Sequence, residues 1–408
     1  AEAMSDSLTG TRPRRVLYVE SNEDGTVGGS HKILFDLVTR LSPAVRPTVL
    51  FYQDNVWADR LRERGIDVRT WDAHRKNERR GLREGGKVMT ALTLAGSIRY
   101  RRTFLRSETF DLVHLNNSPF VGYDDWLPAC RLAGIPCTTY VMGGLVPPKD
   151  SLQGFGIRQF DAYFSLSRIM ENFLIENGID SEKILLTYPG LDIDEIESRG
   201  YRPASEVRSE FGLEDGQLLV VMVGNIRRWK GQHVVVEALA GLDAEERRRI
   251  RLLFVGDTNA ESAPYEARLL EAVRKHDLER TAVFTGRRED VPDLLEAADI
   301  AVHSSVEPEP FGLVVQEAMV HGCATVAADE GGPVEMITED SGMTFSPSDP
   351  SQLTRALEAL IRDEELRDRL ADGARRRARV FEQTQLVSFI ENHYRSLLEG
   401  LPARERAS

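Results

Sequence analysis

The chain has 408 residues, of which 41% are hydrophobic and 29% are charged, and its formal net charge at pH 7 is −13. This length exceeds one ordinary hydrophobic core and predicts two domains of similar size. The acidic balance argues against a nucleic-acid-binding protein, because such proteins need a basic surface. No window approaches the roughly 20 apolar residues of a membrane span and no secretory signal is visible, so we expect a cytoplasmic protein.

In the first half, short β-branched runs alternate with amphipathic stretches, which predicts a parallel sheet with crossover helices. The predicted strands cover residues 16–20, 48–52, 112–115, 138–142, 162–166 and 184–188. Cys130 and Cys137 lie in this half, and Cys323 makes the total odd. Because the three lack metal-ligand spacing, we expect buried free thiols in a reducing compartment.

Gly28 and Gly29 follow the first predicted strand and precede a helix expected to begin near His31, with Ser30 as its N-cap. Glycines without a Cβ let the backbone approach a phosphate or sugar closely, although a glycine pair before a helix is also an ordinary turn. The spacing differs from the dinucleotide-binding fingerprint, which disfavours a nicotinamide-dependent dehydrogenase.

The polar, turn-rich segment 189–215 is predicted to be a hinge, after which the α/β pattern restarts. Strands are predicted at residues 218–224, 252–256, 282–286, 300–303, 325–328 and 343–345, and the tail is predicted to form helices at 351–362, 364–380 and 383–398. Each half therefore reads as a doubly wound α/β unit. In such sheets, ligands bind beyond the carboxyl ends of the strands, and two facing units create a cleft.

Cationic residues follow two strands of the second half. Arg227, Arg228 and Lys230 come after strand 218–224, where positive charge can stabilise a diphosphate leaving group; solvated surface residues are the alternative. Arg287 and Arg288 follow strand 282–286, where a base or ribose could be held. For these two, a loop capped by Asp290 at the next helix is the alternative.

Glu309 and Glu317 lie eight positions apart in the segment 307–335. Pro310 predicts that Glu309 lies in a loop, and the periodicity of LVVQEAMVHG predicts a helix that carries Glu317 in its second turn and ends at Gly322. The first amides of this helix favour an anion. Carboxylates that accept hydroxyl hydrogen bonds beside phosphate-binding amides suit a nucleotide sugar.

With GNIRRWKG, FVGD, FTGRREDVPDLLEAADI, EPFGLVVQEAM and GGPVE in this order, the chain resembles the retaining nucleotide-sugar glycosyltransferases of family 4, the glycosyl transferases group 1. The resemblance implies the α/β fold of GT-B type, with two Rossmann-like doubly wound parallel-sheet domains facing across a cleft. Residues 1–192 would bind the acceptor and 193–382 the donor, and a helix at about 383–400 would pack back on the first domain.

The resemblance also implies roles for individual residues. Glu309 would contact hydroxyls of the donor sugar, Glu317 the ribose and Lys230 the diphosphate. The remaining donor-binding positions would be Gly28, Gly29, Asn225, Arg227, Arg287, Phe311, Gly312, Leu313 and Val314. Catalysis would depend on Glu309, Lys230 and Arg228, with no metal and no cofactor beyond the nucleoside diphosphate sugar as co-substrate.

Two departures from the family pattern affect this assignment. Asn225 stands where the family usually has an arginine, so Arg227 or Arg228 would supply the missing charge. Met142-Gly143 stands where the family has a histidine-glycine pair that reaches the C6 side of the sugar, which would suit a donor without a 6-hydroxyl. The alternatives are a shifted alignment, or a contact made by Asn116 or Asn117.

The acceptor would be a saccharide, a lipid-linked saccharide or a small-molecule glycoside. Residues 71–110 form a basic island with interleaved apolar residues, which would fit peripheral contact with an anionic membrane; a solvated helix face is the alternative. A non-catalytic nucleotide-sugar-binding protein, with Asn225 and Met142 as degenerate positions, stays open as a function. A nucleotide-sugar epimerase or a phosphorylase would also use this architecture, but neither signature is visible.

Overall fold

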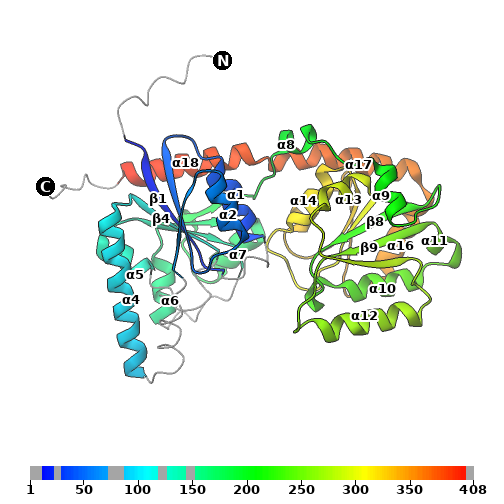
Figure 1. The fold of residues 1–408 in the computed structure, drawn as a ribbon, viewed down its shortest axis with the longest axis horizontal. Helices are drawn as coiled ribbons and strands as arrows, with labels where there is room; N and C mark the ends of the chain where they lie inside the picture. Colours follow the sequence, from blue (N-terminus) through cyan, green and yellow to red (C-terminus); the bar gives the residue numbers. More distant parts are fainter. Residues whose placement is uncertain (1–11, 23–28, 72–86, 118–125, 144–151, 401–408) are drawn as a thin grey trace, which may run out of the picture. The chain divides into compact units, whose positions relative to one another are not determined.

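The computed structural model describes residues 12–22, 29–71, 87–117, 126–143 and 152–400. The chain divides into two compact units, each built around its own parallel sheet (Figure 1). Unit 1 comprises Ala1–Tyr188 and Thr384–Ser408, and unit 2 comprises Pro189–Gln383. The last helix of the chain therefore belongs to the same unit as the first strand.

The sheet of unit 1 has seven parallel strands in the order β3-β2-β1-β4-β5-β6-β7. The strands are β1 (Arg14–Glu20), β2 (Val45–Phe51), β3 (Asp67–Thr70), β4 (Leu112–Asn116), β5 (Cys137–Val141), β6 (Ala162–Ser165) and β7 (Ile184–Leu186). Strand β1 pairs with β2 on one side and β4 on the other. The strand order reverses between β1 and β4, the switch point at which such sheets bind ligands.

Helices cover both faces of this sheet. They are α1 (Ser30–Thr39), α2 (Val56–Glu63), α4 (Lys87–Glu108), α5 (Trp126–Ala133), α6 (Leu152–Gly156), α7 (Arg168–Glu176) and α18 (Gln383–Glu399), with short turns η1 (Ile157–Gln159) and η2 (Ser181–Lys183). Alternate strand residues point to opposite faces. Leu17 and Val113 pack in a cluster with Leu105 of α4, whereas Tyr18 and His114 face the other side.

Helix α18 covers this second face through one buried tyrosine. The ring of Tyr394 lies 6.0 Å from His114 and 6.0 Å from Phe164, and its hydroxyl lies 2.8 Å from His114 Nδ1. Burial lowers the pKa of His114 to about 3, so its imidazole is neutral at pH 7. The C-terminal helix is thus part of the core of unit 1.

The sheet of unit 2 has six parallel strands in the order β10-β9-β8-β11-β12-β13. The strands are β8 (Leu218–Val223), β9 (Ile250–Val255), β10 (Ala282–Gly286), β11 (Ile300–His303), β12 (Ala324–Ala328) and β13 (Met343–Phe345). The helices are α8 (Ile193–Ser198), α9 (Ala204–Glu210), α10 (Gln232–Gly241), α11 (Ala244–Arg248), α12 (Ala263–Lys275), α13 (Val291–Ala297), α14 (Leu313–Val320), α15 (Pro333–Met336), α16 (Pro350–Arg362) and α17 (Glu364–Ala378), with turns η3 (Arg228–Lys230) and η4 (Arg379–Phe381). Here the order reverses between β8 and β11.

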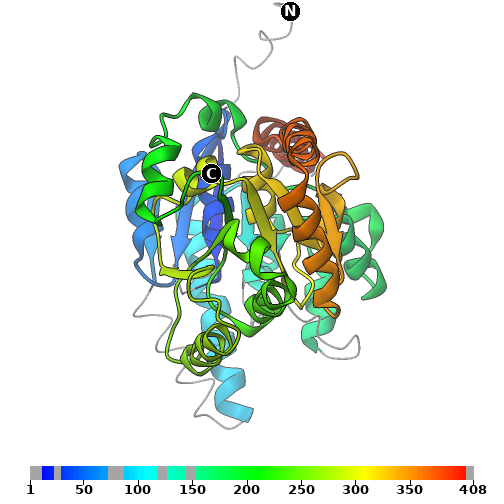
Figure 2. The same cartoon turned by 90° about the vertical axis from the view of Figure 1, so that its right-hand side faces the viewer.

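Helices cover the sheet of unit 2 (Figure 2), and alternate residues of β8 pack against its two opposite faces. Val220 packs in a cluster with α10, α12 and α16, whereas Val221 packs in a cluster with α9, α13 and α14. The two-unit, parallel α/β fold predicted from the sequence is confirmed. Among the described helices, none combines the length and apolar character needed to cross a bilayer.

Three local predictions are corrected. The edge strand β3 was not predicted. It has only four residues, most of them are exposed, and they show no alternation of apolar and polar side chains. The segment 189–215, predicted as a hinge, begins at the boundary between the two units, but it contains helices α8 and α9, which were not predicted. Gly29 rather than Ser30 is the N-cap of α1, where no side chain caps the helix.

Candidate functional site

The switch point of unit 2 brings together residues that are far apart in the sequence. Lys230 lies in η3, which follows β8, and Glu309 lies in the loop that follows β11. Because β8 and β11 are adjacent and parallel, both loops leave the same edge of the sheet. The loops contact each other through a hydrogen bond from Val306 N to Trp229 O of 2.8 Å.

The side-chain hydrogen bonds of Glu309 to described residues all involve one carboxylate oxygen, Oε1. Its Oε1 accepts from Lys230 Nζ at 2.7 Å and lies 2.8 Å from His303 Nε2. Ser305 Oγ also donates to this oxygen and lies 3.2 Å from His303 Nε2. Within the described ranges, no hydrogen bond to Glu309 Oε2 is found, so this second oxygen is available to a ligand.

The surroundings keep Glu309 ionised. Burial by itself raises the pKa of a carboxyl group, but the hydrogen bond from His303 and the charge of Lys230 outweigh it and hold the pKa of Glu309 well below its usual range. A carboxylate that stays charged accepts stronger hydrogen bonds from hydroxyl groups than a neutral acid does. The site thus presents a fixed anionic acceptor.

Glycines allow the backbone of this site to pack closely. Gly231 has a φ of 74°, and a Cβ added to it would lie 1.9 Å from Ser304 O. Gly331 has a φ of 76°, and its Cβ would lie 2.5 Å from Glu309 O. Both positions require glycine, because any other residue would displace the loops that carry Lys230 and Glu309.

Helix α14 begins directly after this loop, with Gly312 as its N-cap in the left-handed region. The ring of Phe311 is buried against Phe381 at 6.0 Å, which anchors the helix start. The first turn of a helix leaves backbone N–H groups without intrahelical partners, so the amides of Leu313 and Val314 suit an anion. Glu317 is half-buried in the second turn, as predicted.

The other cations after β8 do not join Glu309. Arg227 Nη1 donates to Asn259 Oδ1 at 2.7 Å and to Ser262 Oγ. Arg228 is exposed on η3. Asn225 accepts from Asp257 N through its side-chain oxygen at 3.3 Å. The structure therefore brings Lys230 to the carboxylate, whereas the catalytic role predicted for Arg228 has no contact among the described residues to support it.

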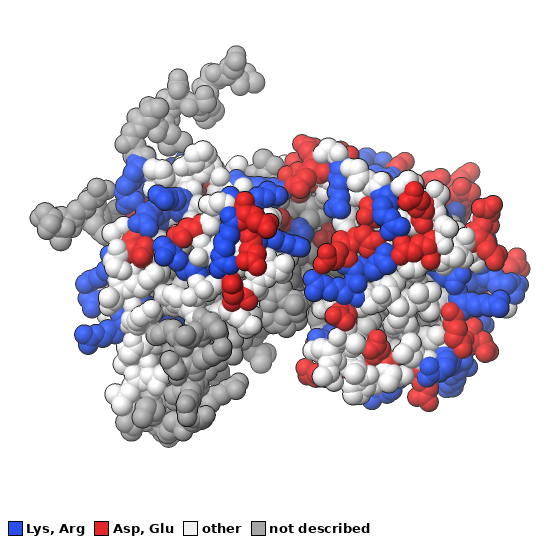
Figure 3. All heavy atoms as spheres, in the orientation of Figure 1, with Lys and Arg blue, Asp and Glu red and all other residues white. Residues whose placement is uncertain are grey.

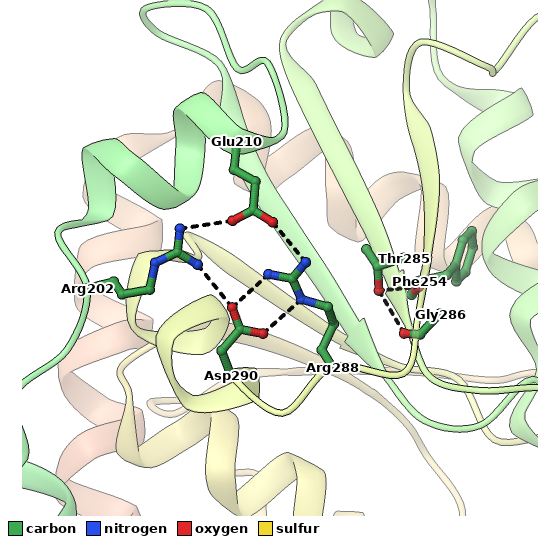
Figure 4. Close-up of polar contacts among 7 residues, drawn as sticks. All are labelled: Arg202, Glu210, Phe254, Thr285, Gly286, Arg288 and Asp290. Carbon is green, nitrogen blue, oxygen red and sulfur yellow. Dashed lines mark hydrogen bonds and ion pairs between the residues drawn. The ribbon is translucent and has the colours of Figure 1, made fainter.

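Arg288 is held in an ion-pair network rather than at the cluster around Glu309 (Figure 4). Its guanidinium pairs with Asp290 at 2.7 Å and with Glu210 at 2.8 Å, and Arg202 closes the ring by pairing with both acids. Asp290 is the N-cap residue of α13, as the sequence-based alternative has it, but its side chain binds arginines and makes no capping hydrogen bond to the helix. The side chain of Arg287 is 56% exposed and lies 3.8 Å from Glu289.

Unit 1 has a second polar cluster at its own switch point. Glu20, the last residue of β1, is fully buried and accepts from Asn22 N at 2.7 Å and from Asn116 Nδ2 at 2.5 Å. Asn116, the last residue of β4, also donates to Ser30 O at 3.1 Å. Burial raises the pKa of Glu20 to about 7.

The other positions predicted in unit 1 are only partly described. Gly28 lies outside the described residues, and Gly29 precedes α1. Met142 is half-buried directly after β5, and Asn117 has a φ of 68° just after β4. Nothing in these positions tests the proposed absence of a 6-hydroxyl on the donor.

The basic island is partly structural. Residues 72–86 lie outside the described part of the chain, and Arg101 of α4 is buried, where it donates to Ser97 and lies 5.2 Å from the Trp126 ring. Arg99 and Arg106 are exposed on the same helix.

Basic and acidic side chains are interspersed over the visible face of unit 2 (Figure 3). Within the described ranges, no group of three or more His, Cys, Asp or Glu residues could hold a metal ion.

His303 and Ser305 were missed by the sequence reasoning. The available signal was position, since both residues stand at the carboxyl end of a predicted strand, six and four residues before Glu309. A histidine in a strand most often packs in the core, so only the fold shows that His303 and Ser305 turn to the carboxylate.

Known sequences and structures extend these observations. A sequence model described as glycosyl transferases group 1 matches residues 204–377, which include the cluster around Glu309. This part of the chain therefore resembles that family. A relative named N-acetyl-alpha-D-glucosaminyl L-malate synthase, from Bacillus anthracis, is 29% identical over 62% of this chain and 65% of its own length. A D-inositol 3-phosphate glycosyltransferase from Xylanimonas cellulosilytica is 31% identical over 56% of this chain and 54% of its own length.

Solved structures with low sequence identity share the fold. The crystal structure of Anabaena Alr3699/HepE in complex with UDP and glucose superposes with a TM-score of 0.76 and 23% identity, covering 94% of this chain and 100% of that one. A glycosyltransferase from Rickettsia africae gives a TM-score of 0.80 at 18% identity and covers 96% of this chain and 100% of that one. The fold of this chain is therefore of the GT-B type.

Proposed function

We propose that the protein transfers a sugar from a nucleoside diphosphate sugar to a hydroxyl group of a saccharide, a lipid-linked saccharide or a small-molecule glycoside, with retention of the anomeric configuration. The observation that carries this proposal is the ionised Glu309, paired with Lys230 beside the start of α14. Three kinds of group thus meet at one sheet edge: a hydroxyl acceptor, a cation and free helix amides.

These groups match the parts of the proposed donor. Lys230 and the amides of Leu313 and Val314 would hold the diphosphate, and Glu309 Oε2 would accept from a sugar hydroxyl. Glu317, one turn further along α14, would bind the ribose. The presence of UDP and glucose in the HepE crystals supports starting with uridine nucleotides.

The reaction breaks the bond between the anomeric carbon and the diphosphate oxygen and forms a bond to the acceptor oxygen. Negative charge develops on the leaving diphosphate, where Lys230 and the helix amides stabilise it. The acceptor proton leaves with the products, and no enzymic nucleophile is assigned. We expect turnover without added metal, because these cations and amides supply the positive charge.

The proposal is tested by a thermal-shift screen of UDP, GDP, ADP and their sugars. A ligand at a hundred times its dissociation constant should stabilise the protein by about 2.7 kcal/mol. Sugars that bind are then tested for release of nucleoside diphosphate. Glu309→Ala and Glu317→Ala should weaken use of the donor, whereas Lys230→Ala should mainly slow the chemical step. The proposal is wrong if no compound of the panel binds.

The same screen separates the alternatives. A non-catalytic nucleotide-sugar-binding protein would be stabilised but would release no nucleoside diphosphate, even by slow hydrolysis. An epimerase would convert the sugar without releasing the nucleotide. Turnover restricted to 6-deoxy sugars or pentoses would support a link between Met142 and the missing 6-hydroxyl, whereas use of ordinary hexoses alone would remove it.

Peripheral membrane contact is a separate proposal for residues 71–110. Since Arg101 is buried, exposed residues of α4 such as Arg99 and Arg106 would have to supply the charge. Each basic residue near an anionic surface contributes about 1 kcal/mol. Co-sedimentation with vesicles that contain phosphatidylserine, at low salt, tests the contact, and Arg99→Ser with Arg106→Ser should reduce it.

A further inference from the structure

The three partners of Glu309 differ in their freedom to move. His303 and Ser305 are 5% and 2% exposed, and both lie at the end of β11, within six residues of the carboxylate. The side chain of Lys230 is 15% exposed and comes from η3, in a different loop. Two partners are therefore fixed by the sheet, and one is a flexible side chain near the surface.

The ammonium group of Lys230 also makes a cation–π contact. Its Nζ lies 4.3 Å from the centroid of the Trp229 ring, which is 37% exposed. A cation over an aromatic face gains about 0.5–1 kcal/mol at an exposed site. The aliphatic part of the side chain lies beside Gly224.

In the proposed function, the diphosphate of the donor and Glu309 compete for the ammonium group of Lys230. It would have to neutralise the diphosphate, yet in this structure its ammonium is bound to Glu309. A buried carboxylate that loses its cation is destabilised by roughly 3–5 kcal/mol unless other donors support it. His303 and Ser305 are such donors, and their hydrogen bonds to Oε1 do not depend on Lys230.

The imidazole contacts fit this supporting role. His303 Nδ1 is buried and has no hydrogen-bond partner among the described residues. The neutral tautomer with its proton on Nε2 therefore satisfies the contact to Glu309 and leaves only an acceptor nitrogen unpaired. The hydrogen bond between Nε2 and Oε1 holds the carboxylate independently of Lys230.

We propose that His303 is a positioning residue that holds Glu309 in place while Lys230 moves from this carboxylate to the diphosphate of the donor. This inference rests on the proposed function. It explains why all three contacts converge on Oε1, because Oε2 then keeps its orientation toward a sugar hydroxyl before and after Lys230 leaves.

The proposal predicts that a substitution of Glu309 restores the affinity for a nucleoside diphosphate that a substitution of His303 weakens. A histidine with only a structural role would not produce this restoration. Without His303, Glu309 depends more strongly on Lys230, so a nucleoside diphosphate must compete harder for the lysine and binds less tightly. Replacing Glu309 by glutamine removes the charge that retains Lys230. The second substitution should therefore restore the binding that the first one weakens.

The experiment titrates UDP and GDP, which lack the sugar, into four purified proteins by calorimetry. His303→Phe should weaken binding about tenfold, a difference of ~1.4 kcal/mol. The double variant His303→Phe/Glu309→Gln should return to within about threefold of the affinity of Glu309→Gln alone. His303→Gln, which keeps an N–H donor at similar reach, should retain binding close to that of the natural protein.

A matched control exists in the same unit. His321 is also a buried histidine that contacts a glutamate, with His321 Nδ1 lying 2.9 Å from Glu296 Oε2. His321→Phe should lower the melting temperature without changing the affinity for UDP or GDP. If His303→Phe does not fold, Ser305→Ala removes the other neutral donor and should show the same reversal with Glu309→Gln.

Two results overturn the inference. Losses that simply add in the double variant would show that His303 acts independently of the exchange of Lys230. Equal effects of His303→Phe and His321→Phe would show a general loss of packing. A natural protein that binds neither UDP, GDP nor any other nucleoside diphosphate would overturn the proposed function itself, and the inference with it.

Discussion

Glu20 and Glu309 occupy corresponding places in the two units, since each lies at the switch point of its own parallel sheet. Both are buried, but their partners differ. Glu20 accepts from a backbone amide and from the amide of Asn116, so burial prevails and raises its pKa to about 7. Glu309 accepts from Lys230 and His303, and its pKa falls well below its usual range.

Both acids are buried, so the difference between their pKa values comes from their partners: His303 and Lys230 lower the pKa of Glu309, whereas the amide donors of Glu20 do not offset burial. The acid in unit 2 is a constant anion, suited to binding hydroxyl groups. The acid in unit 1 titrates near neutrality and links β1, β4 and the start of α1 through Asn22 and Asn116. The predictions below test this contrast, from the largest expected effect to the smallest.

The largest effect is expected where the cation itself is removed. Lys230→Met should lower kcat by roughly a hundred- to thousandfold with the donor identified in the screen, because a preorganised charge at the leaving group is lost. Lys275→Met, at an exposed position of α12, is the control and should leave kcat unchanged. A loss of less than about threefold in kcat would contradict the role assigned to Lys230.

Glu20→Gln should stabilise the protein at neutral pH. The folded-state pKa of about 7 lies above the unfolded value, so the contribution of Glu20 is fully present below about pH 4.3 and is lost as the pH rises to about 7. At pH 8 the gain should reach at most about 3.5 kcal/mol. Urea unfolding at pH 5 and pH 8 measures it, with the exposed Glu176→Gln as the control. A gain of the same size at both pH values would contradict the shift.

Glu309→Gln should act with the opposite sign. The folded-state pKa is depressed, so Glu309 contributes stability above about pH 4.3, and this contribution is lost as the pH falls toward the folded-state value. We expect the variant to be less stable by about 1.5 kcal/mol at pH 7, where hydrogen bonds to a charged group are lost. The difference should shrink below pH 4 in urea unfolding, and a constant difference would refute the prediction.

Most of the fold could be predicted from the sequence, because buried parallel strands are short apolar runs that alternate with amphipathic helices. Strand β3 could not be predicted, because its residues Asp67–Thr70 are mostly exposed and follow no apolar pattern. Helices α8 and α9 were also missed, since they are short and their polar residues resemble a linker.

The site was predictable where local sequence determines geometry. Pro310 and Gly312 fix a loop before a helix, so Glu309 and Glu317 could be placed on these elements in advance. Contacts between loops were not predictable. The pairing of Lys230 with Glu309, and of Arg288 with Glu210 rather than with a ligand, depends on which strands become neighbours.

The position of Tyr394 has a consequence for how the protein is made. Its ring fills a space against His114 and Phe164, and α18 joins the first unit only after all of unit 2 has been added to the growing chain. Domains usually fold in order as they leave the ribosome. Here α1 already packs on this face, but the part of its cover that Tyr394 supplies is missing until α18 has been made, so a product truncated before α18 would leave His114 and Phe164 without this cover.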